Sequence, residues 1–153
     1  MQDLPKITLI TCGYKKLNQT YSNIEHIISE DVEPYEAFND GVQSSNSLIY
    51  GFLDQYSDFS VDDAVEQIVQ KFLTYPELGG VYADNILNGY RQYYPAYSYE
   101  STQNIVIQTP FFCRRELNIK FEQSDMCYYE AIKNIGSYTI LHHIPKALFK
   151  IVV

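Results

Sequence analysis

Two carboxylates, Asp54 and Asp58, follow a wholly apolar run at residues 48–53 (LIYGFL). Such a short continuous run favours a buried strand. In an open α/β sheet, ligands bind beyond the carboxyl ends of the strands. Carboxylates released at that place suit a divalent cation and the phosphates that it holds. The alternative role for Asp54 is that of a turn residue at a strand end.

Strands and helices alternate along the chain. Ser60 and Asp63 have the spacing of a capping box, and an apolar stripe at helical period follows them until Pro76. A second helix is predicted over residues 124–134, with Gly136 just beyond its end. Short apolar runs predict strands at residues 7–12, 24–28, 48–53, 81–83, 105–113 and 138–142. This order predicts an α/β fold with a mostly parallel sheet flanked by helices.

Composition excludes several classes of protein. At 153 residues, one domain over residues 1–153 is expected. The net charge of −8 argues against a nucleic-acid partner and against adhesion to anionic lipid. No apolar run approaches the roughly 20 residues of a membrane helix, and no signal peptide is evident. Three scattered cysteines without a CxxC pair indicate neither a disulfide framework nor zinc. A location in the cytoplasm or at its membrane face is expected.

Five segments, in order, carry a family resemblance. They are ITLITCGY, LNQTYSNIEHII, SEDVEPYEAFNDGV, IYGFLDQYSDF, and VIQTPFFCRREL with KFEQSDMCYYEAIKNIG. The third resembles the pattern "SE-D-G-IYDAMNKGI", the fourth "IIGFLNSDDxF", and the last "HQxxFxRR…FDE…DYDLxLRxxxxG". Together they resemble the family 2 glycosyltransferases of exopolysaccharide, colanic-acid and lipopolysaccharide assembly. The resemblance implies a GT-A, Rossmann-like fold.

The resemblance also implies an activity. The family moves a sugar, with inversion, from a nucleotide-diphosphate sugar to a saccharide or lipid-linked acceptor. A divalent cation, Mn²⁺ or Mg²⁺, neutralises the leaving diphosphate, and a carboxylate accepts the proton of the attacking hydroxyl. The motif places Asp125 as that base and Asp54 as the ligand of the nucleotide sugar or the metal. Otherwise Asp125 is a carboxylate at a helix N-terminus, stabilised by the macrodipole.

The chain departs from the family where the metal motif should be. Tyr56 and Ser57 stand at the positions of two acidic residues. A phenol keeps its proton at neutral pH, so Tyr56 does not replace a carboxylate. Asp58 completes the metal site with Asp54 if the turn holds one extra residue; otherwise the site has lost a ligand.

The chain is also shorter than the family pattern. It lacks the first helix and the "DDGSxD" segment that normally contacts the nucleotide, for which Glu30 and Asp31 are partial substitutes. Asn39 and Gly41 match the signature; an Asn/Gly turn is one interpretation and contact with the nucleotide sugar is the other. The donor pocket is expected to be more open than usual or completed by a partner.

Four further features leave alternatives open. Asp84 either faces the same rim or is a turn residue. Alternation along a strand sends His142 and His143 to opposite faces, so at most one reaches the site. The pair Arg114 and Arg115 meets an acceptor phosphate or is solvated. The tyrosine-rich residues 90–99 (YRQYYPAYSY) form a sugar-binding loop, a packed loop, or a self-association surface of a homo-oligomer.

Two hypotheses follow from these features. The first is a working nucleotide-sugar-dependent glycosyltransferase with Asp125 as base. The second is a catalytically silent GT-A-like module that binds saccharide or a partner enzyme, and the changed motif at Tyr56 and Ser57 motivates it.

Overall fold

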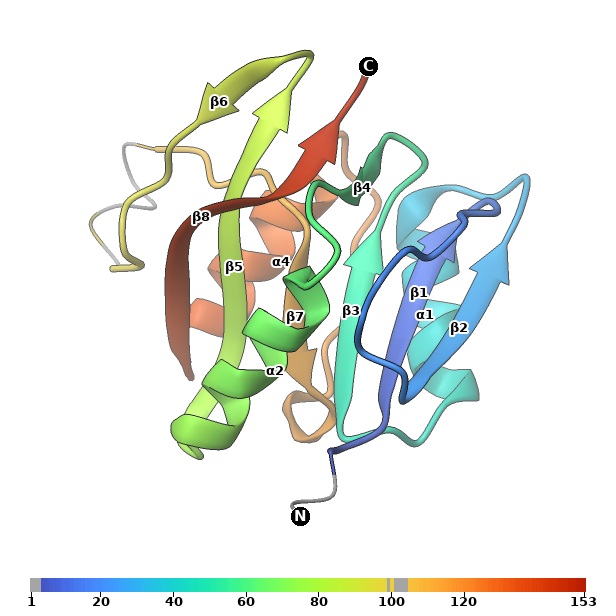
Figure 1. The fold of residues 1–153 in the computed structure, drawn as a ribbon, viewed down its shortest axis with the longest axis horizontal. Coiled ribbons are helices and arrows are strands. Elements are labelled where there is room, and N and C mark those ends of the chain that lie inside the picture. Colours follow the sequence, from blue (N-terminus) through green and yellow to red (C-terminus); the bar gives the residue numbers. More distant parts are fainter. Residues whose placement is uncertain (1–3, 99, 101–104) are drawn as a thin grey trace.

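The computed structural model shows a twisted mixed sheet with helices on both faces (Figure 1). It describes residues 4–98, 100 and 105–153. The helices are α1 (Pro34–Ser44), α2 (Ala64–Thr74) and α4 (Cys127–Gly136), and η1 (Arg115–Leu117) is a 3₁₀ turn. The strands are β1 (Ile7–Cys12), β2 (Ile24–Ser29), β3 (Ile49–Leu53), β4 (Ser57–Phe59), β5 (Leu78–Leu87), β6 (Tyr90–Gln92), β7 (Phe111–Arg114) and β8 (Ile140–Ile151).

The strand order is β2-β1-β3-β7-β5-β8-β4, with β6 paired to β5. The pairings show that β1, β2, β3, β5 and β8 run in one direction, whereas β4, β6 and β7 run against them. The predicted α/β class is confirmed, and the sheet is mixed. The sequence did not reveal the direction of β7, because a strand buried on both faces has the same apolar pattern in either direction.

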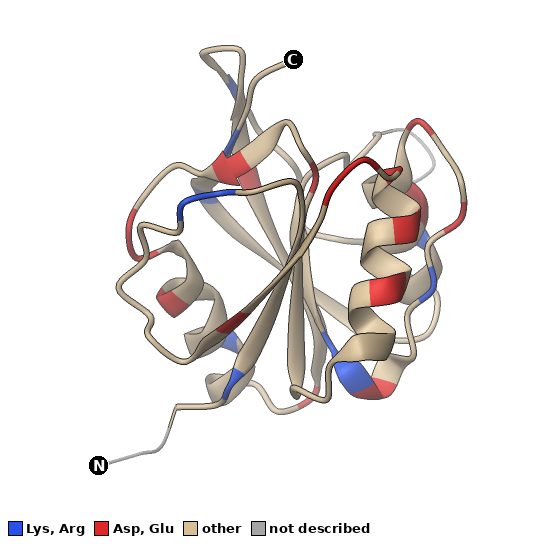
Figure 2. Cartoon of the chain, turned by 90° about the vertical axis from the view of Figure 1, so that its right-hand side faces the viewer, with Lys and Arg blue, Asp and Glu red and all other residues tan. Residues whose placement is uncertain are grey.

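Two hydrophobic clusters cover the two faces of the sheet. On one face α2 packs with Val65, Ile68 and Val69 against side chains such as Leu9 and Val81. On the other, α1 and α4 enclose an aromatic cluster that includes Phe38, Phe52, Phe111, Phe121 and Tyr128. Figure 2 shows the sheet nearly edge-on between these helices, with acidic residues spread over both sides. Within the described part of the chain, every helix is too short or too polar to cross a membrane.

The segment expected to be a loop with an Asn/Gly turn is helix α1, so that prediction is wrong. Pro34 occupies its first turn, where a missing N–H costs nothing, and Ala37, Phe38 and Gly41 face the core. A Cβ on Gly41 would lie 2.6–2.7 Å from atoms of the Ile10 side chain. Gly41 therefore lets α1 approach β1 closely and makes no turn.

Helix boundaries also differ from the prediction. Helix α2 begins at Ala64, and its N-cap residue Asp63 makes no side-chain capping bond. The Ser60 hydroxyl donates to the Ala147 carbonyl, and Gln19 Oε1 accepts the Val65 N–H at 3.0 Å. Helix α4 begins at Cys127, three residues after the predicted start, and Gly136 is its last residue. Tertiary hydrogen bonds thus override a local capping pattern.

Strands β5 and β8 are longer than predicted and pair in parallel along most of their length. Their register shifts three times, once between Leu78 and Gly80 and then on either side of Asp84, between Ala83 and Asp84 and between Asp84 and Asn85. Bulges of this kind redirect side chains and are common beside functional sites. Asp84 and Asn85 are both buried at this irregular point, so Asp84 lies inside the strand and not at its end as predicted.

Candidate active site

A pocket of about 550 Å³ opens where the co-directional strands end. Residues just after β3, at the carboxyl end of β5 and at the end of β8 line it, together with the turn before α4. Its polar lining includes Asp54, Tyr56, Asn85, Tyr94, Gln108 and Asp125. The position agrees with the rule that α/β sheets bind ligands beyond their carboxyl strand ends.

Hydrogen bonds in a closed ring hold Asp54. Its N–H donates to the Tyr128 hydroxyl (2.5 Å), which donates to Ser57 Oγ (3.4 Å). Ser57 in turn donates to Asp54 Oδ1 (2.6 Å), and the Tyr56 N–H donates to the same oxygen at 3.1 Å. Burial raises the pKa of Tyr128 well above its ordinary value, so the phenol remains a donor. Among the described residues no hydrogen bond reaches Oδ2, which stays available to a ligand.

Asp58 does not join Asp54 in this pocket. It lies in β4, paired with Lys150 of β8, and its Oδ1 accepts the Phe59 N–H (2.8 Å). It lines a separate depression with Lys16 and Lys150. The register of β4 on β8 therefore separates the two carboxylates expected to share a metal, and Ser57 takes the place beside Asp54.

Asp125 lies in the turn before α4 and is exposed at the same pocket as Asp54. Its place is two residues before the first helical residue, Cys127. The fold thus brings together the two carboxylates selected as base and as ligand of the nucleotide sugar, which are far apart in the sequence.

Glu30 and Asp31 line a neighbouring depression of about 530 Å³ beyond β1 and β2. Asp31 has a left-handed backbone, with φ 60°. Gln55 and Glu33 line both depressions, so the two are adjacent. These acidic residues lie on the β2 side of Asp54.

Asn39, which the resemblance suggested for nucleotide-sugar contact, makes a two-point clamp instead. Its Nδ2 donates to the Phe121 carbonyl and its Oδ1 accepts the Phe121 N–H, both at 2.8 Å. Both polar atoms of the side chain are thereby used to attach the segment before α4 to α1.

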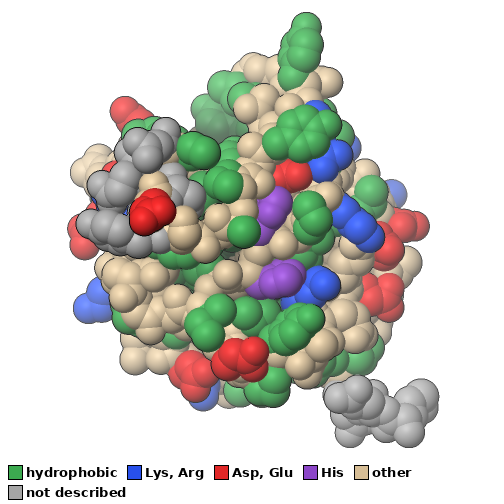
Figure 3. Space-filling view, turned by 90° about the vertical axis from the view of Figure 1, so that its left-hand side faces the viewer, with side chains coloured by type: hydrophobic (Ala, Val, Ile, Leu, Met, Phe, Trp, Pro, Cys, Tyr) green, Lys and Arg blue, Asp and Glu red, His purple; other side chains and the backbone are tan. Residues whose placement is uncertain are grey.

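Asp84 is buried and fully engaged. Its Oδ1 accepts the Tyr94 N–H and faces His143 Nε2, both at 2.8 Å, and its Oδ2 accepts Arg91 at 2.9 Å. His142, the residue before His143, stacks on Tyr75. Figure 3 shows a face on which histidine side chains lie among hydrophobic, basic and acidic ones. The two histidines do diverge, and both have protein partners.

The tyrosine-rich segment divides between packing, surface and pocket. Tyr90 and Tyr93 are exposed, Tyr97 packs with the aromatic cluster, and Tyr94 lines the pocket. Tyr99 lies outside the described residues.

Arg114 and Arg115 lie away from the pocket, at the end of β7. Arg114 donates to the carbonyls of Leu78 (2.6 Å) and Phe72 (2.9 Å), and Arg115 donates to that of Asn46 (3.1 Å). Both arginines stabilise turns of the chain. Arg114 therefore neither faces the pocket, where a phosphate would bind, nor is fully solvated.

The surroundings of the three cysteines make their thiols unreactive. Cys12, Cys113 and Cys127 are all buried and free, as expected. Burial, and then the charge of Asp54, raises the pKa of Cys12 and of Cys127 to about 12. A nucleophilic thiolate at neutral pH is therefore disfavoured.

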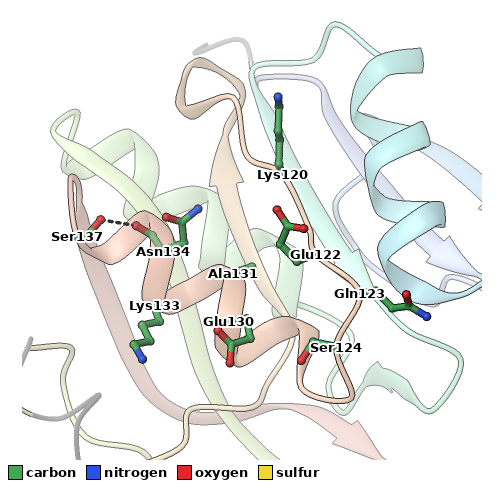
Figure 4. A pocket seen from close by; sticks show the side chains of 9 residues that line it. All are labelled: Lys120, Glu122, Gln123, Ser124, Glu130, Ala131, Lys133, Asn134 and Ser137. Carbon is green, nitrogen blue, oxygen red and sulfur yellow. Dashed lines mark hydrogen bonds between the residues drawn. The ribbon is translucent and has the colours of Figure 1, made fainter.

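A larger hollow of about 710 Å³ lies elsewhere, along α4 and the segment before it (Figure 4). Lys120, Glu122, Glu130 and Lys133 give it mixed charge, and Ser137 bonds back to the Asn134 carbonyl at 2.6 Å. It contains neither Asp54 nor Asp125. Volume alone therefore does not identify the reactive site.

Comparisons with known proteins agree on the fold. No protein-family model matches the chain, and no curated protein matches it. Among solved structures, it is similar to S. aureus TarS (TM-score 0.71, 12% identity), covering 97% of this chain and 37% of that chain. For TarS residues 1–349 in complex with UDP-GlcNAc the TM-score is 0.72 at 11% identity, covering 97% of this chain and 58% of that chain.

A third structure is the mannosyltransferase PcManGT from Pyrobaculum calidifontis, in complex with GDP-Man and Mn²⁺. Its TM-score is 0.65 at 12% identity, covering 97% of this chain and 56% of that chain. The chain has the GT-A glycosyltransferase fold, and it spans about 37–58% of the length of these three structures.

Proposed function

We propose that the chain is the nucleotide-sugar-binding part of an inverting glycosyltransferase. One observation carries the proposal: Asp54 and Asp125, taken from two separate motifs of the family resemblance, line one pocket at the carboxyl ends of the strands. The GT-A fold and the sugar nucleotides in the complexes of TarS and PcManGT support it. The acceptor would be a saccharide or a lipid-linked saccharide, in cell-surface polysaccharide synthesis at the cytoplasmic side.

Asp125 would accept the proton of the acceptor hydroxyl as that oxygen attacks the anomeric carbon. Its exposed place at the pocket lets an acceptor approach from solvent. General-base catalysis of this kind contributes about 10²–10⁴-fold to a rate. Asp54, fixed through Oδ1, would direct Oδ2 toward the diphosphate side of the donor.

A divalent cation fits this site only with help from the substrate. Among the described residues, no group of three or more His, Cys, Asp or Glu side chains could hold a metal ion. Asp54 offers one free carboxylate oxygen, which suits an ion that takes its other ligands from phosphates and water. Mn²⁺ or Mg²⁺ held there would neutralise charge on the leaving diphosphate.

The second candidate function is a silent binding module. Two observations support it: Ser57 stands beside Asp54 where the family motif has an acidic residue, and Asp58 lines a separate depression. Asp54 is therefore the one acidic side chain of the altered motif that lines the pocket. Such a module would bind saccharide or a partner enzyme without transfer.

Calorimetric titration with UDP and GDP, with and without Mn²⁺, is the test. Metal-dependent nucleotide binding is expected, and its absence would count against the enzyme. Donor hydrolysis or transfer is then compared between the unmodified chain and Asp125→Asn. We expect a loss of about 10²–10⁴-fold with nucleotide affinity retained; equal rates would remove Asp125 as base.

A further inference from the structure

Asn85, on the pocket wall formed by β5, has a buried oxygen without a partner. The residue is 1% exposed and lines the same pocket as Asp54 and Asp125. Its Oδ1 is one of two buried side-chain polar atoms that lack a hydrogen bond among the described residues; the other is Thr109 Oγ1. A buried acceptor without a partner is unfavourable and calls for an explanation, such as a ligand that completes it.

The orientation of this amide is determined by its neighbours. The Tyr94 hydroxyl has one proton, which it donates to the Gln108 carbonyl at 3.0 Å. Its oxygen must therefore accept from Asn85, and Nδ2 lies at 3.2 Å to do so. Exchanging the amide oxygen and nitrogen would place two acceptors against each other. Oδ1 is thus the free atom, and it can only accept a hydrogen bond.

The surroundings hold the acceptor rigidly. Asp84, bound by Arg91 and His143, accepts the Tyr94 N–H and so anchors the backbone of Tyr94. Two of the register shifts of β5 on β8 occur on either side of Asp84 and next to Asn85. A preorganised polar atom of this kind favours a ligand group of matching geometry.

The sheet order indicates which part of a ligand meets Asn85. The depression lined by Glu30 and Asp31 lies beyond β1 and β2, on one side of Asp54. Asn85 lies on β5, on the other side of β3, in the pocket of Asp125. A nucleoside on the β2 side with its diphosphate at Asp54 would place the sugar, which is rich in O–H donors, toward Asn85.

We propose that Asn85 Oδ1 accepts a hydrogen bond from a hydroxyl of the transferred sugar, which makes Asn85 a specificity-determining residue. This inference rests on the proposed function of the pocket. A sugar that presents a hydroxyl in the matching configuration would be preferred over its epimer, because the epimer leaves Oδ1 unpaired.

The test compares Asn85→Leu with the matched control Thr109→Val, which removes the other unpartnered buried oxygen. Calorimetry measures the affinities for UDP, GDP, UDP-GlcNAc, UDP-glucose, UDP-galactose and GDP-mannose. We expect the unmodified chain to bind one sugar nucleotide at least fivefold more tightly than its nucleoside diphosphate. Asn85→Leu should lose roughly tenfold in affinity for that sugar nucleotide, with the diphosphate unchanged within twofold. Thr109→Val should change neither affinity.

Each contrary result has one meaning. Retained sugar preference in Asn85→Leu overturns the inference. Equal loss of diphosphate and sugar-nucleotide binding in Asn85→Leu identifies a structural amide and also overturns it. If the unmodified chain binds the diphosphates but gains nothing from the sugar, this inference fails and the nucleotide pocket stands. If it binds none of the six compounds, the proposed function itself fails.

Discussion

Asp54 directly follows β3 and Asp84 lies in β5, two strands that run in the same direction, and the structure uses the two carboxylates in different ways. Asp84 is 2% exposed, and both of its oxygens have partners, in Tyr94, His143 and Arg91. Asp54 is partly exposed, with Oδ1 held by Tyr56 and Ser57 and Oδ2 left open to the pocket.

The difference separates a structural carboxylate from one able to bind. A buried charge whose two oxygens both have protein partners is stabilised by the fold and is closed to a ligand. A carboxylate fixed through one oxygen is oriented and still reactive through the other. We therefore expect changes at Asp84 to act on stability and changes at Asp54 to act on binding.

Asp84→Ala should give the largest effect. The change leaves Arg91, His143 and the Tyr94 N–H without their shared acceptor. The free energy of unfolding should fall by roughly 2–4 kcal/mol, less than for a fully buried pair because Arg91 is about one-third exposed. Urea denaturation measures this loss. A variant as stable as the unmodified chain would break the comparison.

Asp54→Asn should have the opposite effect, with weaker nucleotide binding and nearly unchanged stability. The amide retains an oxygen for Ser57 and Tyr56 and loses the negative charge at Oδ2. Affinity for UDP or GDP with Mn²⁺ should fall about 10–100-fold, the range for a charge-assisted interaction, while the unfolding midpoint stays nearly constant. Titration calorimetry and urea denaturation of the same preparation provide the two readouts. Lost stability with unchanged affinity would reverse the assigned roles.

Tyr128→Phe tests the ring that orients Asp54. Tyr128 is 1% exposed, and its hydroxyl both accepts the Asp54 N–H and donates to Ser57. Its removal should cost about 1–2 kcal/mol of unfolding free energy and weaken nucleotide binding less than Asp54→Asn does. Tyr82→Phe is the control, because Tyr82 is equally buried and donates to the Pro95 carbonyl. The control should lose stability and keep its affinity.

Alkaline pH should give the smallest effect. Burial raises the pKa of Cys12 and Cys127 from 9.0 to about 12 and that of Cys113 still higher. The unfolded chain then releases thiol protons that the folded chain retains, so stability falls as pH rises through 9. The three thiols predict a loss of roughly 1 kcal/mol between pH 8 and pH 9.

Denaturation curves at the two pH values measure that loss, and Cys→Ala variants should remove it. The Asp54 charge contributes to the raised pKa of Cys12 and Cys127 and not to that of Cys113. Burial is the larger cause, so both pKa values should stay well above 9 in Asp54→Asn, and the loss between pH 8 and pH 9 should be unchanged. A smaller loss in Asp54→Asn would mean that the charge of Asp54, more than burial, keeps the two thiols protonated.

Much of the fold could be predicted from local pattern. The apolar runs of β1, β2 and β3 and the stripe of α2 lie where periodicity indicated them. Helix α1 was missed because Asn39 and Gly41 were interpreted as turn residues. The close approach to Ile10 that explains Gly41 is a contact between elements, which no local pattern records.

The candidate site was predictable where a motif placed a residue after a strand. Asp54 was found in this way, whereas Asp125 came from the family resemblance alone; the two line one pocket. Asn85 and Tyr128 were not selected, because nothing in their local sequence distinguishes them from core residues. Tyr94 was included only as part of the tyrosine-rich residues 90–99. Asp58 was assigned to the metal because sequence spacing does not reveal the pairing of β4 with β8.

The sequence by itself determined the α/β class, the buried strands and the place of Asp54, because apolar periodicity and strand-end position are local properties. Asp125 was selected from the family resemblance. The tertiary structure alone decided which oxygens remain free. Oδ2 of Asp54 and Oδ1 of Asn85 are available because hydrogen bonds from distant residues occupy the neighbouring atoms. Residue type sets how many hydrogen bonds a side chain can make, whereas the fold determines which of them are already made.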